Sequence, residues 1–167
     1  MDLIREHHLW QLFIYSPAEV TSATLLQLFK PVYATGPGSR DKKAFEQETM
    51  RNFARFLTAL EGNYSLGWQH AIRIWFFAYS VLVISEHSLP ESNATCGDIL
   101  QFVTGSHAEP PMGFPNQPKV QFVHDSDRYP SASTCSLVLY LPTGINFEQL
   151  AERMLVSLAN GATFSVM

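Results

Sequence analysis

One cysteine of this chain lies where a reactive thiol would be expected. Cys135 stands among Ser131, Ser133, Thr134 and Ser136, directly before an apolar, β-like run. A cysteine that only fills space usually lies inside an apolar run, whereas a polar loop lets a thiolate be solvated and reached by a partner. The residue types therefore favour nucleophilic thiol chemistry, and a small structural cysteine is the alternative that composition leaves open.

Groups that could assist such a thiol occur just upstream. His124 would form a Cys–His pair with Cys135, and Asp125 or Asp127 would supply a carboxylate beside it. We count His124 and Asp125 as supporting candidates, and a cysteine hydrolase that uses them as one hypothesis. The competing interpretation is that they are surface side chains. No histidine cluster has the spacing of metal ligands, so neither a metal nor another cofactor is expected.

The motifs around this cysteine occur in a defined order over roughly residues 97–167. They are, in sequence, Phe-Val-Thr-Gly at 102–105, Gly113-Phe114, a β-like stretch at 120–124, Pro130, Ala132, Thr134-Cys135, Leu141-Pro142, a helix-like stretch at 147–158, and Phe164. This order resembles the C-lobe of HECT-type ubiquitin ligases. Within that family, the pattern is most similar to the shorter ligases of the G2/M-phase-specific type.

The resemblance implies a ubiquitin-protein transferase. Cys135 would take ubiquitin from a ubiquitin-conjugating enzyme as a glycyl thioester and pass it to a lysine of a protein substrate. Thr134 would hydrogen-bond the loop or the thioester carbonyl, and Pro130 would stiffen the loop entry. Phe164, at the family's tail position, would order the ubiquitin-loaded state. Local structure or packing explains Thr134 and Phe164 equally well.

Two departures from the family pattern favour a second hypothesis. The family often has His or Asn two residues before the cysteine and Phe directly after it, and these positions are Ser133 and Ser136 here. The missing phenylalanine predicts a more mobile loop and a lower activity. Most of the N-lobe, which docks the conjugating enzyme in the family, also has no counterpart. The alternative is therefore a weak or inactive HECT-like fragment that binds ubiquitin or another partner.

The elements that must position Cys135 are predicted to form a small α+β domain of two layers. Strands are expected at 119–124 and 137–141, where apolar and β-branched residues cluster. A short helix is expected at 97–103. A last helix is expected to begin at Asn146, with Gln149 as its capping partner three residues on. A few strands covered by helices agree with a HECT C-lobe-like domain.

The chain divides at residues 62 and 63 in this interpretation. Residues 1–62 are predicted to be a helical remnant of the HECT N-lobe, and residues 63–167 the C-lobe-like domain. Residues 67–95 resemble either the first helix of a C-lobe or an insertion, and both interpretations stay open. The apolar stretch at 74–84 is shorter than the ~20 residues that cross a bilayer, so a buried helix is expected there.

The first region carries three helix patterns. One is expected at residues 3–15. A second would begin at the cap residue Ser16 and be stopped by Pro31. The third is expected at 43–61, with Phe45 at the start of an apolar stripe that repeats every three or four residues.

Composition limits the class of protein. An apolar content of 46% and a charged content of 16% indicate a globular chain of one domain or slightly more. A net charge of −4 argues against nucleic acid or an anionic membrane as a partner. Cys96 and Cys135 are expected to be free thiols of a reducing compartment, the cytoplasm or the nucleus, since no secretory signal opens the sequence.

Overall fold

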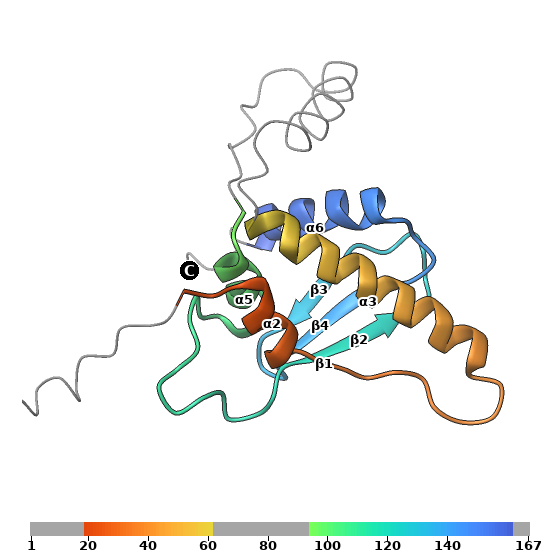
Figure 1. Cartoon of the computed structure of the whole chain (residues 1–167), viewed down its shortest axis with the longest axis horizontal. Coiled ribbons are helices and arrows are strands. Elements are labelled where there is room, and N and C mark those ends of the chain that lie inside the picture. Colours follow the sequence, from red (N-terminus) through yellow and green to blue (C-terminus); the bar gives the residue numbers. More distant parts are fainter. Residues whose placement is uncertain (1–18, 62–93, 162–167) are drawn as a thin grey trace, which may run out of the picture.

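The computed structural model of the chain describes residues 19–61 and 94–161 (Figure 1). Its helices and strands follow one another as α2 (Ser22–Leu28), β1 (Lys30–Pro31), α3 (Arg40–Glu61), α5 (Cys96–Thr104), β2 (Lys119–Val123), β3 (Ser131–Ser133), β4 (Val138–Pro142) and α6 (Phe147–Gly161). The strands form a single mixed sheet, which the helices cover. The predicted α+β class is therefore confirmed.

The sheet combines parallel and antiparallel pairs. Its strand order is β1-β2-β4-β3, with β1, β2 and β4 parallel and β3 antiparallel to β4. Val120 is paired with Leu139 and Phe122 with Leu141. Side chains alternate between the faces of a strand, so these four residues point to the same face. That face is the one that packs into the core.

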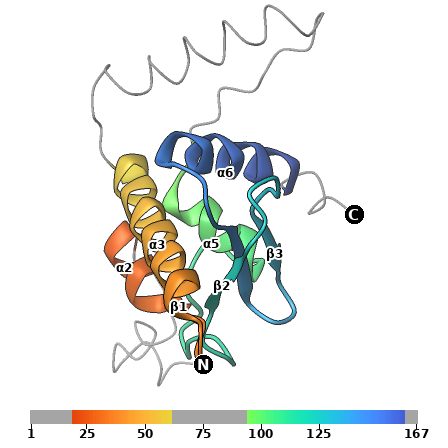
Figure 2. The ribbon, with the colours of Figure 1, turned by 90° about the vertical axis from the view of Figure 1, so that its right-hand side faces the viewer.

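Two long helices cover this face of the sheet. α3 and α6 lie side by side across it, and the helices together form a layer to one side of the strands (Figures 1 and 2). α6 begins as predicted: the backbone N–H of Gln149 donates to the Asn146 side chain at 2.9 Å, and the Asn146 N–H donates back to Gln149 at 3.2 Å. Such reciprocal bonds satisfy donors that a helix start leaves unpaired.

The described parts of the two predicted regions share one core. Leu25 and Phe53, from the first region, are fully buried in the same cluster as Val120, Leu139 and Met154 from the second. β1 also joins the sheet by pairing with β2. Residues 19–61 are thus a structural part of the domain that holds Cys135, and the description of residues 1–62 as an N-lobe remnant stays a prediction.

The helix predicted to start at Ser16 begins later. Residues 19–21 are not helical, and Ser16 lies outside the described residues. Thr21 is the N-cap of α2, where its hydroxyl accepts a hydrogen bond from the backbone N–H of Thr24 at 3.1 Å. The helix also ends before Pro31, which lies in β1. Threonine and serine both cap helix starts. Here Thr21 is the cap, and the pattern at Ser16 did not predict where α2 begins.

The buried face of α3 also differs from the prediction by one residue. Phe45, expected in the apolar stripe, is 52% exposed, whereas Glu46 is 3% exposed. The Glu46 carboxylate accepts a hydrogen bond from the backbone N–H of Ala34 at 2.7 Å and contacts His124 at 3.0 Å. A buried carboxylate is tolerated when its oxygens are paired in this way, and a hydropathy pattern cannot register such partners.

Several predicted features lie outside the described residues. They are the helix at 3–15, the apolar stretch at 74–84, nearly all of the segment 67–95, and Phe164. In the part of the chain that the structure does describe, no helix is long and apolar enough to span a membrane.

Candidate functional site

Cys135 lies in the loop of a β-hairpin. β3 and β4 pair antiparallel from Ser131 with Tyr140 to Ser133 with Val138. Residues 134–137 connect the two strands, and we call them the Cys135 loop. Cys135 is an exposed, free cysteine within this loop. The prediction of a polar loop is confirmed at the cysteine, but residues 131–133 form a strand that the sequence did not reveal, since its serines lack an apolar alternation.

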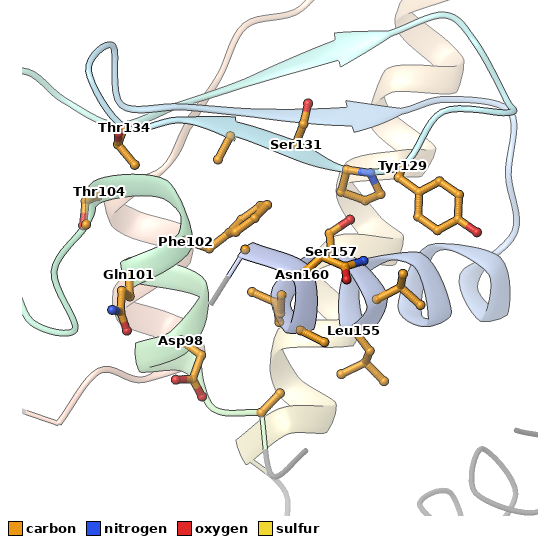
Figure 3. Close-up of a pocket in the computed structure, with 18 of the residues that line it drawn as sticks. Asp98, Gln101, Phe102, Thr104, Tyr129, Ser131, Thr134, Leu155, Ser157 and Asn160 are labelled. Carbon is orange, nitrogen blue, oxygen red and sulfur yellow. The ribbon is translucent and has the colours of Figure 1, made fainter. Parts of the chain in front are cut away.

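A broad groove opens beside this loop. Its volume is about 1100 Å³, and α5, β3 with its flanking residues, and the second half of α6 form its walls (Figure 3). We call it the α5–α6 groove. Its lining includes Phe102, Thr104, Pro130, Thr134 and Cys135. Cys135 therefore lies beside an opening large enough to receive an extended segment of another chain.

One glycine allows the two helices of this groove to approach each other. A Cβ atom at Gly161, the last residue of α6, would lie 2.8 Å from two ring atoms of Phe102 in α5. Non-bonded carbon atoms pack at about 3.5–4.0 Å, so a larger residue would require the Phe102 ring to move. The absence of a side chain at Gly161 therefore lets this ring lie against the end of α6.

The supporting residues predicted from the sequence are only partly gathered here. Thr134 is exposed and lines the groove beside Cys135. Pro130 also lines it, but is buried and precedes β3, so it stiffens the entry to the strand rather than the Cys135 loop. The predicted roles of these two side chains remain predictions.

His124 and Asp125 lie at the other end of the sheet. Both follow β2, which is parallel to β4, whereas Cys135 precedes β4. Five strand residues at about 3.3 Å each separate the two ends by roughly 16 Å. His124 therefore cannot act as a base for Cys135, and the structure disfavours the cysteine hydrolase. The arrangement of strands decides this point, because the two residues are close in sequence.

His124 instead belongs to a polar cluster with Glu46 and Thr143. Its Nε2 lies 3.0 Å from the Glu46 carboxylate, and its Nδ1 lies 3.1 Å from the Thr143 hydroxyl. Burial, together with the charge of Glu46, raises the pKa of Tyr33 above its usual value. The cluster joins α3 to the ends of β2 and β4, so its role is structural.

The second cysteine is chemically quiet. Cys96 is 4% exposed, and its thiol donates a weak hydrogen bond to the Leu57 carbonyl, with a sulfur–oxygen distance of 3.8 Å. Burial and the nearby charge of Glu61 raise the pKa of Cys96 to about 11. A thiol of this kind has almost no reactive thiolate at neutral pH.

Sequence reasoning missed one arginine that fixes the approach to β3. The Arg153 guanidinium, on α6, donates to the backbone carbonyls of Ser126 and, at 3.0 Å, of Arg128. It also lies over the ring of Tyr129, 5.6 Å from the ring centre. These contacts hold the connection between β2 and β3 against α6. An arginine in an amphipathic helix pattern carries no sequence signal for this role.

Metal-ligating side chains are dispersed in the part of the chain that the structure describes. In residues 19–61 and 94–161, no three or more His, Cys, Asp or Glu side chains gather where they could hold a metal ion. Cys135 offers an exposed thiol beside the groove.

Residues 92–167 match a family model described as HECT-domain (ubiquitin-transferase). No curated protein matches the chain. The matched segment contains α5, the sheet strands β2 to β4, and α6, and therefore the whole α5–α6 groove and the Cys135 loop. It supports a HECT-type ligase fragment and, with it, an activity of the ubiquitin transferase kind. HECT domains in general work with ubiquitin, conjugating enzymes and substrates.

Proposed function

We propose that this chain accepts ubiquitin on Cys135 and passes it to a substrate lysine. The observation that carries the proposal is the position of the thiol, exposed in a short hairpin loop on the rim of the α5–α6 groove. The hairpin lies within the segment that matches the HECT family model. Among the described cysteines, Cys135 alone is open to a macromolecular partner, since Cys96 is buried.

The first step is a thioester exchange. The Cys135 thiolate attacks the carbonyl carbon of the ubiquitin thioester, and a new carbon–sulfur bond forms. The bond to the donor sulfur breaks, and the donor leaves as a thiolate that takes up a proton. Because one thioester is replaced by another, the acyl group keeps its reactivity. A thiolate is also a strong nucleophile near neutral pH.

The second step moves ubiquitin to an amine. The neutral amine of a substrate lysine attacks the thioester on Cys135 and a carbon–nitrogen bond forms. The carbon–sulfur bond breaks, and Cys135 leaves as a thiolate that takes up the proton lost by the amine. The contribution of the protein is to hold the thioester and the amine together, where a well-oriented pair reacts as if at very high concentration. The groove beside Cys135 is the surface available for that purpose.

A conjugating enzyme would supply the donor thioester in this proposal. Residues 19–61 pack into the same core as the matched segment, so within the described residues there is no separate lobe on which that enzyme would dock. We therefore expect docking to require a surface beyond the described residues or a second protein. The assignment to the G2/M-phase-specific type among HECT ligases is likewise a proposal, carried by the order of motifs.

The test supplies the donor chemically. The full chain is mixed with the thioester of ubiquitin and 2-mercaptoethanesulfonate, which needs no conjugating enzyme, and the products are separated on a non-reducing gel. We expect an adduct that a thiol reductant removes, and none with the Cys135→Ala variant. Cys96→Ser is the matched control and should retain the adduct. An adduct that persists in Cys135→Ala would overturn the assignment.

A binding module is the second candidate function. The size and open form of the α5–α6 groove favour it, since they suit a bound segment whether or not a reaction follows. A titration of the isotopically labelled chain with ubiquitin, followed by NMR, would place the contact surface. Shifts at α5 and α6 without any thioester adduct would support binding alone, and efficient transfer would exclude it.

The cellular setting remains part of the proposal. The two free thiols suit a reducing compartment, the cytoplasm or the nucleus. The net charge of −4 supports protein partners over nucleic acid or an anionic membrane surface.

A further inference from the structure

We propose that Leu137 is a positioning residue that holds the Cys135 loop in the form that accepts ubiquitin. This inference rests on the proposed function. It concerns a buried leucine two residues after the thiol, which the sequence predicted to be an ordinary residue of the second strand.

The backbone of Leu137 adopts an unusual conformation. Its φ is +54°, and it is the one residue other than glycine with a positive φ in the part of the chain that the structure describes. The left-handed region is unfavourable for a side chain with a Cβ, and a bulky residue is rarely found there. Such conformations persist only where the surrounding structure holds them, and they concentrate at functional sites.

Two contacts hold Leu137 in this conformation. Its side chain is 6% exposed, while Thr134, Cys135 and Ser136 before it are all exposed. Its carbonyl accepts a hydrogen bond from the backbone N–H of Lys119 at 2.8 Å, at the start of β2. Both the side chain and the backbone of Leu137 are therefore held in place, at the point where the loop enters β4.

A polar contact closes the rest of the loop. The Ser136 hydroxyl donates to the Ser133 hydroxyl at 2.7 Å, across the residues that carry Cys135. The serine after the cysteine was expected to leave the loop without an apolar anchor. In the structure the buried side chain of this loop is one residue later, at Leu137, and Ser136 forms the polar contact instead.

Leu137 acts through the loop and not on the ligand. It does not line the α5–α6 groove, and it stands outside the main core cluster of the described residues. Its loss should therefore loosen the Cys135 loop more than the rest of the fold. A thiol displaced by about 1 Å reacts much more slowly with a large, oriented partner, whereas a small reagent reaches it from any direction.

The test compares substitutions of Leu137 in the full chain. Leu137→Ala removes the anchor and keeps the strained backbone, Leu137→Gly removes both, and Leu137→Met retains an apolar anchor. Ile145→Ala is the matched control, since Ile145 is also buried, at 7% exposure, and follows the opposite end of β4. The first readout is the rate of adduct formation with the ubiquitin thioester, and the second is alkylation of Cys135 by iodoacetamide.

We expect Leu137→Ala and Leu137→Gly to lower the rate of adduct formation by at least about 10-fold. Alkylation should change by less than about 3-fold, because the thiol is already exposed. Leu137→Met should restore most of the rate, and Ile145→Ala should leave the rate per folded molecule close to that of the unaltered chain. The inference is overturned if Leu137→Ala behaves as the unaltered chain or if Ile145→Ala slows adduct formation as much.

Hydrogen exchange of the loop amides separates this inference from the proposed function. If Leu137 anchors the loop, Leu137→Gly raises exchange at residues 134–136 well above that in Ile145→Ala, whether or not ubiquitin is ever accepted. Unchanged exchange at these residues overturns the inference. An unaltered chain that forms no adduct refutes the proposed function alone, provided that the exchange still responds to Leu137.

Discussion

The dipeptide Thr-Cys occurs twice in this chain, and the two copies have opposite environments. Thr95 caps α5, so that Cys96 becomes the first residue of a buried helix turn at 4% exposure. Thr134 instead opens a hairpin loop, and Cys135 is exposed on the rim of a groove. The same two residue types thus give a buried, unreactive thiol at Cys96 and an exposed thiol at Cys135.

The difference shows that packing around the cysteine matters more than its immediate neighbours. Burial and the Glu61 charge raise the pKa of Cys96 to about 11, so this thiol stays neutral. The Cys135 loop joins the edge strand β3 to its neighbour β4, and Cys135 is exposed within it.

The largest difference should appear in ubiquitin acceptance. Cys135→Ala should abolish the thiol-sensitive adduct, whereas Cys96→Ser should keep it, because only the first thiol is within reach of a partner. A non-reducing gel after incubation with the ubiquitin thioester gives the result. Loss of the adduct in Cys96→Ser, with the fold intact by circular dichroism, would break the contrast.

The two thiols should also differ in their reaction with a small reagent. In the folded chain, iodoacetamide should modify Cys135 at least about 100-fold faster than Cys96, since burial and a raised pKa both protect the second thiol. Peptide mass spectrometry after timed quenching would measure both rates. In urea, where the protection of Cys96 is lost, the rates should converge. Equal rates in the folded chain would contradict the structure.

His124 should affect stability and not the chemistry of Cys135. In His124→Ala the Glu46 carboxylate, 3% exposed, keeps the Ala34 N–H as a partner but loses the imidazole. We expect the free energy of unfolding to fall by about 2 kcal/mol, measured by urea denaturation. The alkylation rate of Cys135 should stay the same, and a large fall would return His124 to the role of a catalytic base.

The raised pKa of Cys96 predicts a loss of stability at alkaline pH. In the unfolded chain Cys96 ionises near its usual pKa, about 8.5, whereas in the folded chain it stays neutral up to about pH 11. Over this interval the folded state binds more protons than the unfolded state, so stability falls as pH rises. The contribution is roughly 3 kcal/mol, complete below pH ~8 and lost as pH rises to ~11.

A comparison of two variants isolates this contribution. Cys96→Ser keeps a donor for the Leu57 carbonyl but does not ionise in this range, so its unfolding free energy should fall less steeply with pH. Tyr33, whose pKa is also raised, titrates equally in both chains and cancels. Parallel pH profiles of the two chains would show that Cys96 does not titrate differently on folding.

The sequence predicted the parts of the fold whose patterns are long or capped. The α+β class, the short helix at 97–103 and the Asn146 cap are all present, because caps and periodic apolar residues act locally. β1 and β3 were not predicted, since a two-residue strand and a strand of serine and alanine carry no alternation. They exist because neighbouring strands supply their hydrogen bonds.

The sequence also predicted only a part of the candidate site. The location of Cys135 in a polar loop followed from its neighbours, and the structure places the loop beside a groove. The distance between Cys135 and His124 follows only from the strand order. The left-handed backbone of Leu137 cannot be predicted from its residue type. Such features depend on tertiary structure, which single-sequence patterns do not encode.

The pairing of β1 with β2 also affects how the chain folds. Lys30 meets Lys119 and Pro31 meets Val120, so the whole segment 32–118 must close as a loop before this edge of the sheet exists. Contacts this distant in sequence slow folding. A shorter chain that began after α3 would leave β2 as an unpaired edge strand, and unpaired edges recruit other chains. We therefore expect such a shortened chain to self-associate, even though it would retain the entire segment that matches the HECT family.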